Sequence, residues 1–421
     1  MKKAVLGFSI ASFVLTLVLI FLGKIESAGI PMLLALTGAT AFSYLEEQYK
    51  KASFTFIVFG FLAAAMYYPF LFTNWGFNTK VLVIPMLQLI MFGMGTKLSL
   101  DDFKKELKEP KGIIIGSLMA FGIMPILGIG VAKAFDFPPE IAVGVILIGA
   151  CPGGAASNVM AFLARGNVAL SVSVTTITTL LTPIVTPAIM KLLANELLEI
   201  SFLKMMFSSF NLIIVPIAAG LICHKILYGK AEWLQKNANI IALGLLFVAA
   251  TVVSIYSPFP PSIAVLQPGL ILAFGLAAIV SFANVIVKSL AGPDDWMNRI
   301  LPALSMTSIV LFVTIVVALN RDKLLLVGLL LVAASAVHNL FGFIIGYWGS
   351  RLAGLSIRDS RTLSIEVALK NGGLGMGLAL EALGNANAAL APIVFGKWMN
   401  ISGSAIANYW RDKPTGDEPT K

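Results

Sequence analysis

Charged residues are scarce in this sequence. Only 12% of its 421 residues are Asp, Glu, Lys or Arg, whereas soluble globular domains contain about 25%. Hydrophobic residues account for 58%, and the mean hydropathy is +0.91. This composition excludes a soluble enzyme, a secreted scaffold and a nucleic-acid-binding protein. The net charge of +9 does not change that conclusion, because excess Lys and Arg in membrane proteins mark cytoplasmic loops.

Cysteine and histidine are also rare. The two cysteines, Cys151 and Cys223, lie in apolar segments and form no C-x-x-C spacing, so neither a disulfide framework nor a cysteine metal site is expected. The two histidines, His224 and His338, belong to no H-E-x-x-H motif, and the apolar runs hold no plausible aspartate pair. The sequence therefore offers no site for an intramembrane enzyme.

Long apolar runs fill most of the chain. A transmembrane helix needs roughly 20 apolar residues, and charged or Pro/Gly-rich segments separate fourteen candidate spans. We place them at 4–23, 28–45, 53–72, 81–97, 112–133, 140–164, 167–193, 202–223, 239–257, 266–288, 300–319, 324–349, 362–384 and 387–410. With both termini cytoplasmic, most of the 30 basic residues fall in inner segments, as the positive-inside rule requires. The sequence thus predicts an all-α polytopic membrane protein with about fourteen transmembrane helices.

Two of these spans are interrupted by small and polar residues. Span six contains CPGGAASN, from Cys151 to Asn158, and span thirteen contains KNGGLG, from Lys370 to Gly375. They are the sixth spans of the first and the second seven, and two repeats of seven would lie in the membrane with opposite orientation. Broken helices at matching positions of inverted repeats point to a transporter binding site near the bilayer midplane. The plainer reading is that Gly and Pro only help membrane helices to pack.

Ionisable residues lie inside the last two spans. Glu366 and Lys370 stand beside the second break, where an ionisable side chain costs roughly 2.5–3.5 kcal/mol on insertion scales. Because they are four residues apart, a continuous helix would place both side chains on one face. We expect the two to pair directly, either as a neutralised buried pair or as part of a functional site. Glu381 and Lys397 are expected near the membrane faces, where Lys can extend to the interface.

Polar uncharged side chains surround the two breaks. Their oxygens, beside unwound backbone with free carbonyls, suit a hard cation such as Na⁺, although Ser and Thr in membrane helices often bond only to their own backbone. His338 and Asn339 of span twelve are read as an interhelical hydrogen-bond pair, with a proton relay as the alternative. The candidate oxygen donors are Ser157, Asn158, Ser171, Ser173, Thr175, Thr176, Thr178, Thr179, Asn400, Ser402 and Ser404.

At these residues the sequence resembles the bile acid:sodium symporter family, in particular its bacterial members. The resemblance covers about residues 81–224 and 300–411. It is carried by CPGGAASNVMAFLARGNVALSVSVTT from Cys151, by RTLSIEV ending at Val367, and by NISGS from Asn400. It implies ten spans in two inverted repeats of five, with a core domain of two crossing broken helices and a flanking panel domain. We expect a multi-pass protein of the inner (plasma) membrane, and the distribution of basic residues places both termini in the cytoplasm.

The chain exceeds this plan by four helices. The first two spans and a pair inserted at about 239–290 would give each repeat two further panel helices, which keeps the symmetry as seven plus seven. The additional helices would either widen the panel or form an oligomer contact. We expect panel helices in 1–110, the first half of the core in 111–194, more panel helices in 195–322, the second half of the core in 323–410, and a cytoplasmic tail in 411–421.

The two sodium sites of the family map unequally onto this sequence. The resemblance implies a first site formed by Ser157, Asn158, Ser171, Thr175 and Glu366. The second site would use Glu366, the backbone at Val367 and Leu369, and two glutamines, at whose positions this chain has Lys370 and Ala120. Because an ammonium at a ligand position repels Na⁺, we expect one retained sodium site and no second one.

The resemblance places the substrate beside the crossing, at Ala155, Asn371, Asn400 and Lys370. Half-helix N-termini and an ammonium both favour negative charge, so we expect a small organic anion, such as a bile acid, a keto acid or a pantoate-like acid. The preferred reading is a secondary active symporter with alternating access, driven by one Na⁺. The alternatives are a sodium-independent or proton-linked carrier in which Lys370 replaces the ion, a channel, and a non-transporting sensor.

Overall fold

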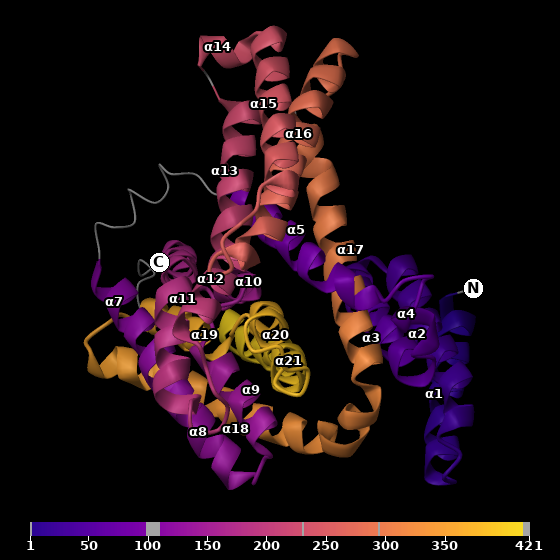
Figure 1. The fold of residues 1–421 in the computed structure, drawn as a ribbon. Coiled ribbons are helices and arrows are strands. Elements are labelled where there is room, and N and C mark those ends of the chain that lie inside the picture. Colours follow the sequence, from indigo (N-terminus) through magenta and orange to yellow (C-terminus); the bar gives the residue numbers. More distant parts are fainter. Residues whose placement is uncertain (1, 98–109, 230, 294, 416–421) are drawn as a thin grey trace. The chain divides into compact units, whose positions relative to one another are not determined.

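The chain is helical throughout the part that the structure describes. The computed structural model describes residues 2–97, 110–229, 231–293 and 295–415, and these contain no β-strand beyond two isolated bridges (Figure 1). The predicted all-α class is therefore confirmed. Most of the predicted tail, from residue 416 on, lies outside the described residues.

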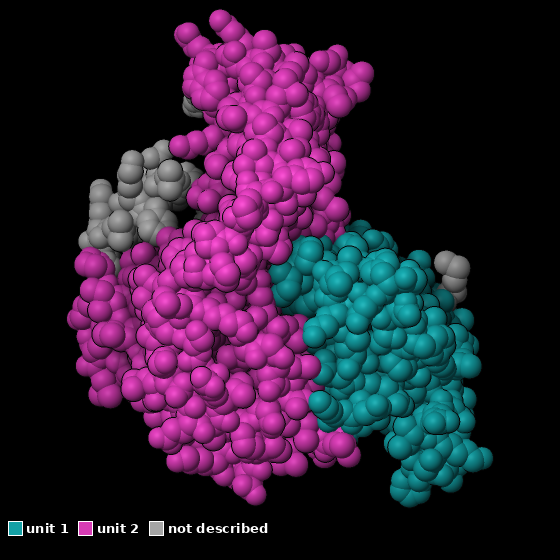
Figure 2. All heavy atoms as spheres, in the orientation of Figure 1, with its two compact units in different colours: residues 1–86, 306–325 teal, residues 87–305, 326–421 magenta. Residues whose placement is uncertain are grey.

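The chain divides into two compact units, coloured separately in Figure 2. Unit 1 comprises residues 1–86 and 306–325, and unit 2 comprises residues 87–305 and 326–421. Helices α5 (Val83–Gly95), α17 (Trp296–Leu319) and α18 (Arg321–Leu352) pass from one unit to the other. The remaining helices of unit 1 are α1 (Lys2–Phe21), η1 (Glu26–Ala28), α2 (Gly29–Leu45), η2 (Glu47–Ala52), α3 (Ser53–Tyr67), α4 (Phe70–Thr73) and η3 (Thr79–Leu82).

Unit 2 contains every candidate site residue. Its first helices are α7 (Pro110–Leu118), the π-helical turn η4 (Met119–Ile123), α8 (Met124–Ala134), α9 (Pro139–Ala150), α10 (Ala155–Leu163) and α11 (Val168–Ala194). The middle helices are α12 (Phe202–Ser209), the π-helical turn η5 (Phe210–Ile214), α13 (Val215–Tyr228), α14 (Glu232–Gln235), α15 (Asn237–Tyr256), η6 (Ala264–Leu266) and α16 (Gln267–Ser289). The last are α19 (Ile357–Ala368), α20 (Gly372–Glu381) and α21 (Leu390–Arg411).

Many of these helices suit a membrane. Among the described residues, nine helical segments are long and apolar enough to cross one, and three shorter apolar helices span Ser53–Tyr67, Thr79–Gly95 and Pro139–Ala150. Each of the fourteen predicted segments contains helix. The chain is accordingly a polytopic, membrane-embedded protein. The count of fourteen crossings and the division into core and panel remain predictions.

Side-chain caps fix where the helices around the site begin. Asn167 Oδ1 accepts a hydrogen bond from the Leu170 amide at the start of α11, and Ser356 does the same for the Asp359 amide at the start of α19. Such caps satisfy amides that have no partner within the helix. The caps therefore define the two helices that carry the hydroxyl groups and the carboxylate of the candidate site.

A buried apolar cluster joins α19 to its neighbours in unit 2. It brings α7, α8 and α11 against α19, so that the central part of α19 is removed from water and lipid. Closely packed cores hold their side chains in fixed positions. The buried members are Ile113, Met119, Met124, Val174, Leu363 and Val367.

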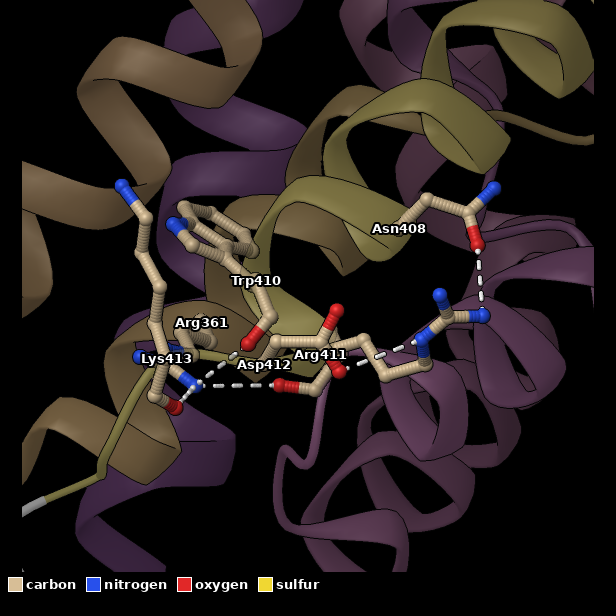
Figure 3. Close-up of polar contacts among 7 residues, drawn as sticks. Arg361, Asn408, Trp410, Arg411, Asp412 and Lys413 are labelled. Atoms are coloured by element: carbon tan, nitrogen blue, oxygen red, sulfur yellow. Dashed lines mark hydrogen bonds and ion pairs between the residues drawn. The ribbon is translucent and has the colours of Figure 1, made fainter.

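Arg361 fastens the C-terminal end of α21 to the start of α19 (Figure 3). Its guanidinium donates hydrogen bonds to the carbonyls of Trp410 (3.2 Å), Lys413 (3.1 Å) and Pro414 (2.8 Å), and it also reaches the Ala164 carbonyl at the end of α10 (3.2 Å). The Arg361 side chain is buried and stacks over the Trp410 ring. Because hydrogen bonds to a charged donor are strong, this contact fixes the ends of three helices.

Candidate ion and substrate site

Two helices are broken where the sequence predicts an interruption, but both breaks are shorter than expected. The first runs from Cys151 to Gly154 between α9 and α10, and the second from Leu369 to Asn371 between α19 and α20. The predicted interruptions extended to Asn158 and Gly375, and this was wrong. Helix resumes earlier because Ser157 N–H bonds to the Gly154 carbonyl and Asn371 Oδ1 accepts from the Leu374 amide.

The two breaks meet through their backbones. The Gly154 amide donates to the Leu369 carbonyl (3.0 Å), and the Asn371 amide donates to the Pro152 carbonyl (2.9 Å). These two bonds form the antiparallel bridge between Gly153 and Lys370. Unwound backbone at membrane depth persists only where its polar groups are satisfied, and here each break satisfies the other.

The carbonyls that end the first halves of the broken helices are capped in matching ways. Thr186 of α11 donates its hydroxyl to the carbonyl of Ala150 (2.6 Å), the last residue of α9. Asn339 of α18 donates its amide to the carbonyl of Ala368 (3.0 Å), the last residue of α19. The neighbouring His338 contacts the Met124 carbonyl through Nε2 (3.1 Å). The interhelical hydrogen-bond reading of His338 and Asn339 is therefore confirmed.

Hydroxyl groups of α11 surround the Glu366 carboxylate. Thr175 Oγ1 donates to Oε2 of Glu366 (2.7 Å), and Ser171 Oγ donates to Oε1. Asn158 Oδ1, on α10, lies 2.8 Å from Ser171 Oγ and 3.5 Å from Thr175 Oγ1. Ser157 Oγ lies 3.4 Å from Thr175 Oγ1 and donates to the Gly154 carbonyl (2.7 Å). The structure thus brings together all five residues predicted for the first sodium site.

This oxygen cluster has fewer protons than acceptors. Ser171 and Thr175 carry one hydroxyl proton each, yet each hydroxyl lies near both Asn158 Oδ1 and a Glu366 oxygen. The single proton of each hydroxyl can therefore fully satisfy only one of these two acceptors. No described Lys or Arg forms an ion pair with Glu366, which is 1% exposed. A monovalent cation with oxygen ligands fits this set, because it supplies the missing positive charge.

The other hydroxyls of α11 play a different part. Thr176, Thr178 and Thr179 donate to backbone carbonyls four residues earlier, at 2.7 Å in each case. Such bonds satisfy the side chain within its own helix. These three candidates are therefore structural, and they separate clearly from Ser171 and Thr175.

Gly153 permits the carboxylate to lie against the first break. A Cβ at this position would lie 2.7 Å from Glu366 Oε2 and 3.4 Å from Thr175 Oγ1. Real Cβ atoms do not approach other atoms so closely, so any larger residue would displace the carboxylate or the break. Gly153 therefore helps to position the Glu366 carboxylate. In the sequence it stands out only as part of the Gly-Gly pair of the first break.

Lys370 does not pair with Glu366, and the expected direct pair was wrong. Helix α19 ends at Ala368, and Leu369 is extended, so residues 366 and 370 do not share a helical face. The Lys370 ammonium instead donates a hydrogen bond to the Ala120 carbonyl in η4 (2.8 Å). The backbone amide of Lys370 contacts Met399 Sδ (3.4 Å). The structure thus brings together the two positions at which the family pattern has glutamines.

The predicted substrate residues lie on three different helices. Ala155 is the exposed first residue of α10, Asn371 is the half-buried cap of α20, and Asn400 is an exposed residue of α21. Asn371 takes part in both the cap and the backbone bridge. Lys370, the fourth predicted substrate residue, has its ammonium on the Ala120 carbonyl.

Lys397 lies on α21 beside the crossing of the two broken helices, and its expected position near a membrane face stays a prediction. Gly396 packs against Gly372, with an added Cβ only 3.3 Å from the Gly372 Cα, and Met399 contacts the Lys370 amide. Hydropathy cannot reveal this position, because it depends on where α20 and α21 touch. Glu381 ends α20 and accepts a hydrogen bond from Asn211 Nδ2 (2.6 Å).

Known proteins to which this chain is similar are described as transporters. Residues 84–266 match the family described as Sodium Bile acid symporter family. The chain is 35% identical over 327 residues to the uncharacterized sodium-dependent transporter YocS of Bacillus subtilis, covering 78% of this chain and 82% of the relative. It is 29% identical to a probable chloroplastic sodium/metabolite cotransporter, BASS1, of Arabidopsis thaliana, covering 77% and 65%. The human ileal sodium/bile acid cotransporter is 34% identical over 174 residues, covering 40% and 48%.

Proposed function

The chain belongs to the Sodium Bile acid symporter family, and we propose that it is a secondary active symporter that moves an organic anion together with one Na⁺. Its relatives are transporters rather than enzymes. The names of these relatives include sodium-dependent transport, and two of them specify a metabolite or a bile acid. Sodium coupling is the property that these names share.

The oxygen cluster around Glu366 is the observation that carries the proposal. Na⁺ would bind between the Glu366 carboxylate, the hydroxyls of Ser171 and Thr175, the Asn158 side-chain oxygen and Ser157. These groups come from α10, α11 and α19, so bound Na⁺ would hold the first break against the second broken helix. An ion can bias a conformational equilibrium only if it binds one state better. Because the ligands come from three helices, the site is complete only when these helices are arranged together, and Na⁺ would favour that state.

One ion rather than two is favoured by the contacts of Lys370. In the second site implied by the resemblance, the ligands would include the positions of Ala120 and Lys370 and the backbone at Val367 and Leu369. Here the Lys370 ammonium donates a hydrogen bond to the Ala120 carbonyl, and the Leu369 carbonyl accepts a hydrogen bond from the Gly154 amide. A tethered positive charge would repel a second Na⁺ and would not follow its gradient.

The crossing suits an organic anion as substrate. Helices α10 and α20 both begin at the breaks, and the positive ends of helix dipoles favour negative charge. We place the substrate beside Ala155, Asn371 and Asn400, on the side of the crossing where these residues are not fully buried. Transport would follow by alternating access, with the site opening to each side of the inner membrane in turn.

The place of the two broken helices in the chain supports an inverted repeat. α9–α10 and α19–α20 are the sixth spans of the first and the second seven, and their breaks bridge each other at Gly153 and Lys370. We propose fourteen spans as two repeats of seven, with core and panel domains and both termini cytoplasmic. The added helices at the N-terminus and at about 239–290 would widen the panel or mediate oligomerisation.

Uptake by the full-length protein in proteoliposomes tests this function. Organic acids, including pantoate, pyruvate and cholate, are supplied with an inward Na⁺ gradient or with K⁺. We expect Na⁺-dependent uptake that Glu366→Gln abolishes, because the site loses its formal anion, while Glu199→Gln at an exposed position leaves uptake unchanged. Normal uptake by Glu366→Gln would overturn the site. Uptake independent of Na⁺ would favour the carrier in which Lys370 replaces the ion.

A further inference from the structure

One ammonium lies beside the crossing without a partner. Lys397 of α21 is half-buried, and it forms no hydrogen bond or ion pair with any described residue. Its position is fixed by Gly396, which packs on Gly372, and by Met399, which contacts the Lys370 amide. Ionisable residues inside membrane proteins almost always face a protein interior or a water-filled cavity. An unpaired ammonium at this position is therefore a candidate binding group.

Lys397 belongs to a polar stripe on α21. Asn400 follows it by three residues and Ser404 by seven, which places the three side chains on one side of the helix. None of the three forms a hydrogen bond with a described residue. On another side of the same helix, the Ser402 hydroxyl lies within hydrogen-bonding distance of Asn339 Oδ1 and of the Trp398 carbonyl (3.0 Å). Ionisable residues in membrane helices almost always face the protein interior or a water-filled cavity, so we expect the stripe of Lys397, Asn400 and Ser404 to face water or substrate.

A transported anion needs a positive group that is free to bind it. Lys370 cannot provide this group, because its buried ammonium donates to the Ala120 carbonyl. Lys397 can, and the start of α20 at Gly372, against which Gly396 packs, adds positive potential of its own. That potential disfavours an isolated cation and favours an anion beside it.

We propose that Lys397 is the counter-ion for the carboxylate of the transported anion, with Asn400 and Ser404 as neighbouring hydrogen-bond groups. This inference rests on the proposed transport of an organic anion and adds the charge class of the substrate. A single ammonium pairs one carboxylate, and a second carboxylate in the same site would be left without a partner. The protein should accordingly prefer monocarboxylates to dicarboxylates.

The first test asks whether Lys397 faces water. In the full-length chain, Lys397→Cys is treated in membranes with the anionic, water-soluble reagent methanethiosulfonate ethylsulfonate. The native Cys151 and Cys223 are both buried, so we expect little modification of the protein that lacks the introduced cysteine. We expect Cys at 397 to be modified, while Cys placed at the exposed apolar position Leu340 of α18 reacts much more slowly. Absence of modification at 397 would overturn the proposal.

The second test measures binding by the purified full-length protein in Na⁺. Pantoate, pyruvate and cholate are the monocarboxylate probes, and succinate is the dicarboxylate. The test uses the monocarboxylate that the unaltered protein binds. We expect Lys397→Gln to lower the affinity for it by a factor of roughly 30 or more, because a desolvated charge pair is lost. Lys397→Arg, which keeps the charge, should retain most of the affinity, and Lys191→Gln at an exposed position should change nothing.

The outcomes separate this inference from the proposed function. Unchanged affinity in Lys397→Gln, or tighter binding of succinate than of every monocarboxylate, would overturn the role of Lys397 and leave sodium-coupled transport in place. If the unaltered protein binds none of the four acids in Na⁺ or in K⁺, both the proposed function and this inference fail.

Discussion

The Lys370 ammonium lies 2.8 Å from the Ala120 carbonyl oxygen, and the two residues are 250 positions apart in the chain. Ala120 belongs to the π-helical turn η4, where the change from i+4 to i+5 bonding leaves a carbonyl available for an outside donor. The contact therefore links the first half of the predicted core to the second break. It gives the buried ammonium one strong acceptor without using the Glu366 carboxylate.

The hydroxyl of Thr175 should be needed for sodium binding, whereas that of Thr178 should not. Thr175→Val removes a hydrogen bond to Glu366 Oε2 and one oxygen of the cluster, so we expect the Na⁺ concentration for half-maximal uptake to rise about tenfold. Thr178→Val is the matched control on the same helix, because Thr178 donates to the Val174 carbonyl. Equal effects of the two substitutions would contradict the assignment of α11 hydroxyls to the site.

Gly153→Ala should weaken sodium binding while the protein still folds and reaches the membrane. The added Cβ would overlap Glu366 Oε2, and relieving a clash of this kind costs about 1–3 kcal/mol. We expect a rise of about tenfold in the Na⁺ concentration for half-maximal binding, measured by titration of the purified protein. Gly130→Ala, where a Cβ meets nothing within 4 Å, is the control. An unchanged titration in Gly153→Ala would show that the carboxylate does not contact the break when Na⁺ binds.

The sequence predicts the helical class and both interruptions because these depend on local composition. Apolar runs of span length, and Gly and Pro beside polar residues, carry that information without reference to distant parts of the chain. The grouping of Ser157, Asn158, Ser171, Thr175 and Glu366 was implied by resemblance, and the structure brings the five residues together.

The errors have a common physical cause. The expected Glu366–Lys370 pair assumed that α19 continued through residue 370, but backbone bonds from the other break end it at Ala368. The position of Lys397 beside the crossing likewise depends on the close approach of Gly396 to Gly372. Contacts between segments distant in sequence decide both points, and neither hydropathy nor spacing contains them.

Cysteine labelling should report fourteen spans with both ends cytoplasmic. Ser262, between α15 and α16, is exposed and should label from outside after substitution by Cys. Gln48, between α2 and α3, is also exposed and should label only after the membrane is permeabilised. Because the native cysteines are buried, a membrane-impermeant maleimide reports the introduced residue. Labelling of both positions from the same side would show that the span count between them is wrong.

The sharpest prediction concerns the number of sodium ions. If the Lys370 ammonium stands in place of a second ion, Na⁺ titration of uptake should give a Hill coefficient near one, because a charge that is part of the chain cannot bind cooperatively with the first ion. Lys370→Gln together with Ala120→Gln restores the side chains that the family pattern has at these positions, and it should steepen the titration. Lys370→Met, which removes the charge without adding a ligand, is the control and should not.

The two-residue variant is the decisive member of that series. Removing the ammonium frees the Ala120 carbonyl, and the added amide oxygens supply ligands beside Glu366. The appearance of a second ion only when both glutamines are present would identify Lys370 and Ala120 as the positions that set the stoichiometry. Clear two-ion cooperativity in the unaltered protein would instead mean that the Lys370–Ala120 contact breaks during transport, and the single-ion mechanism would have to be abandoned.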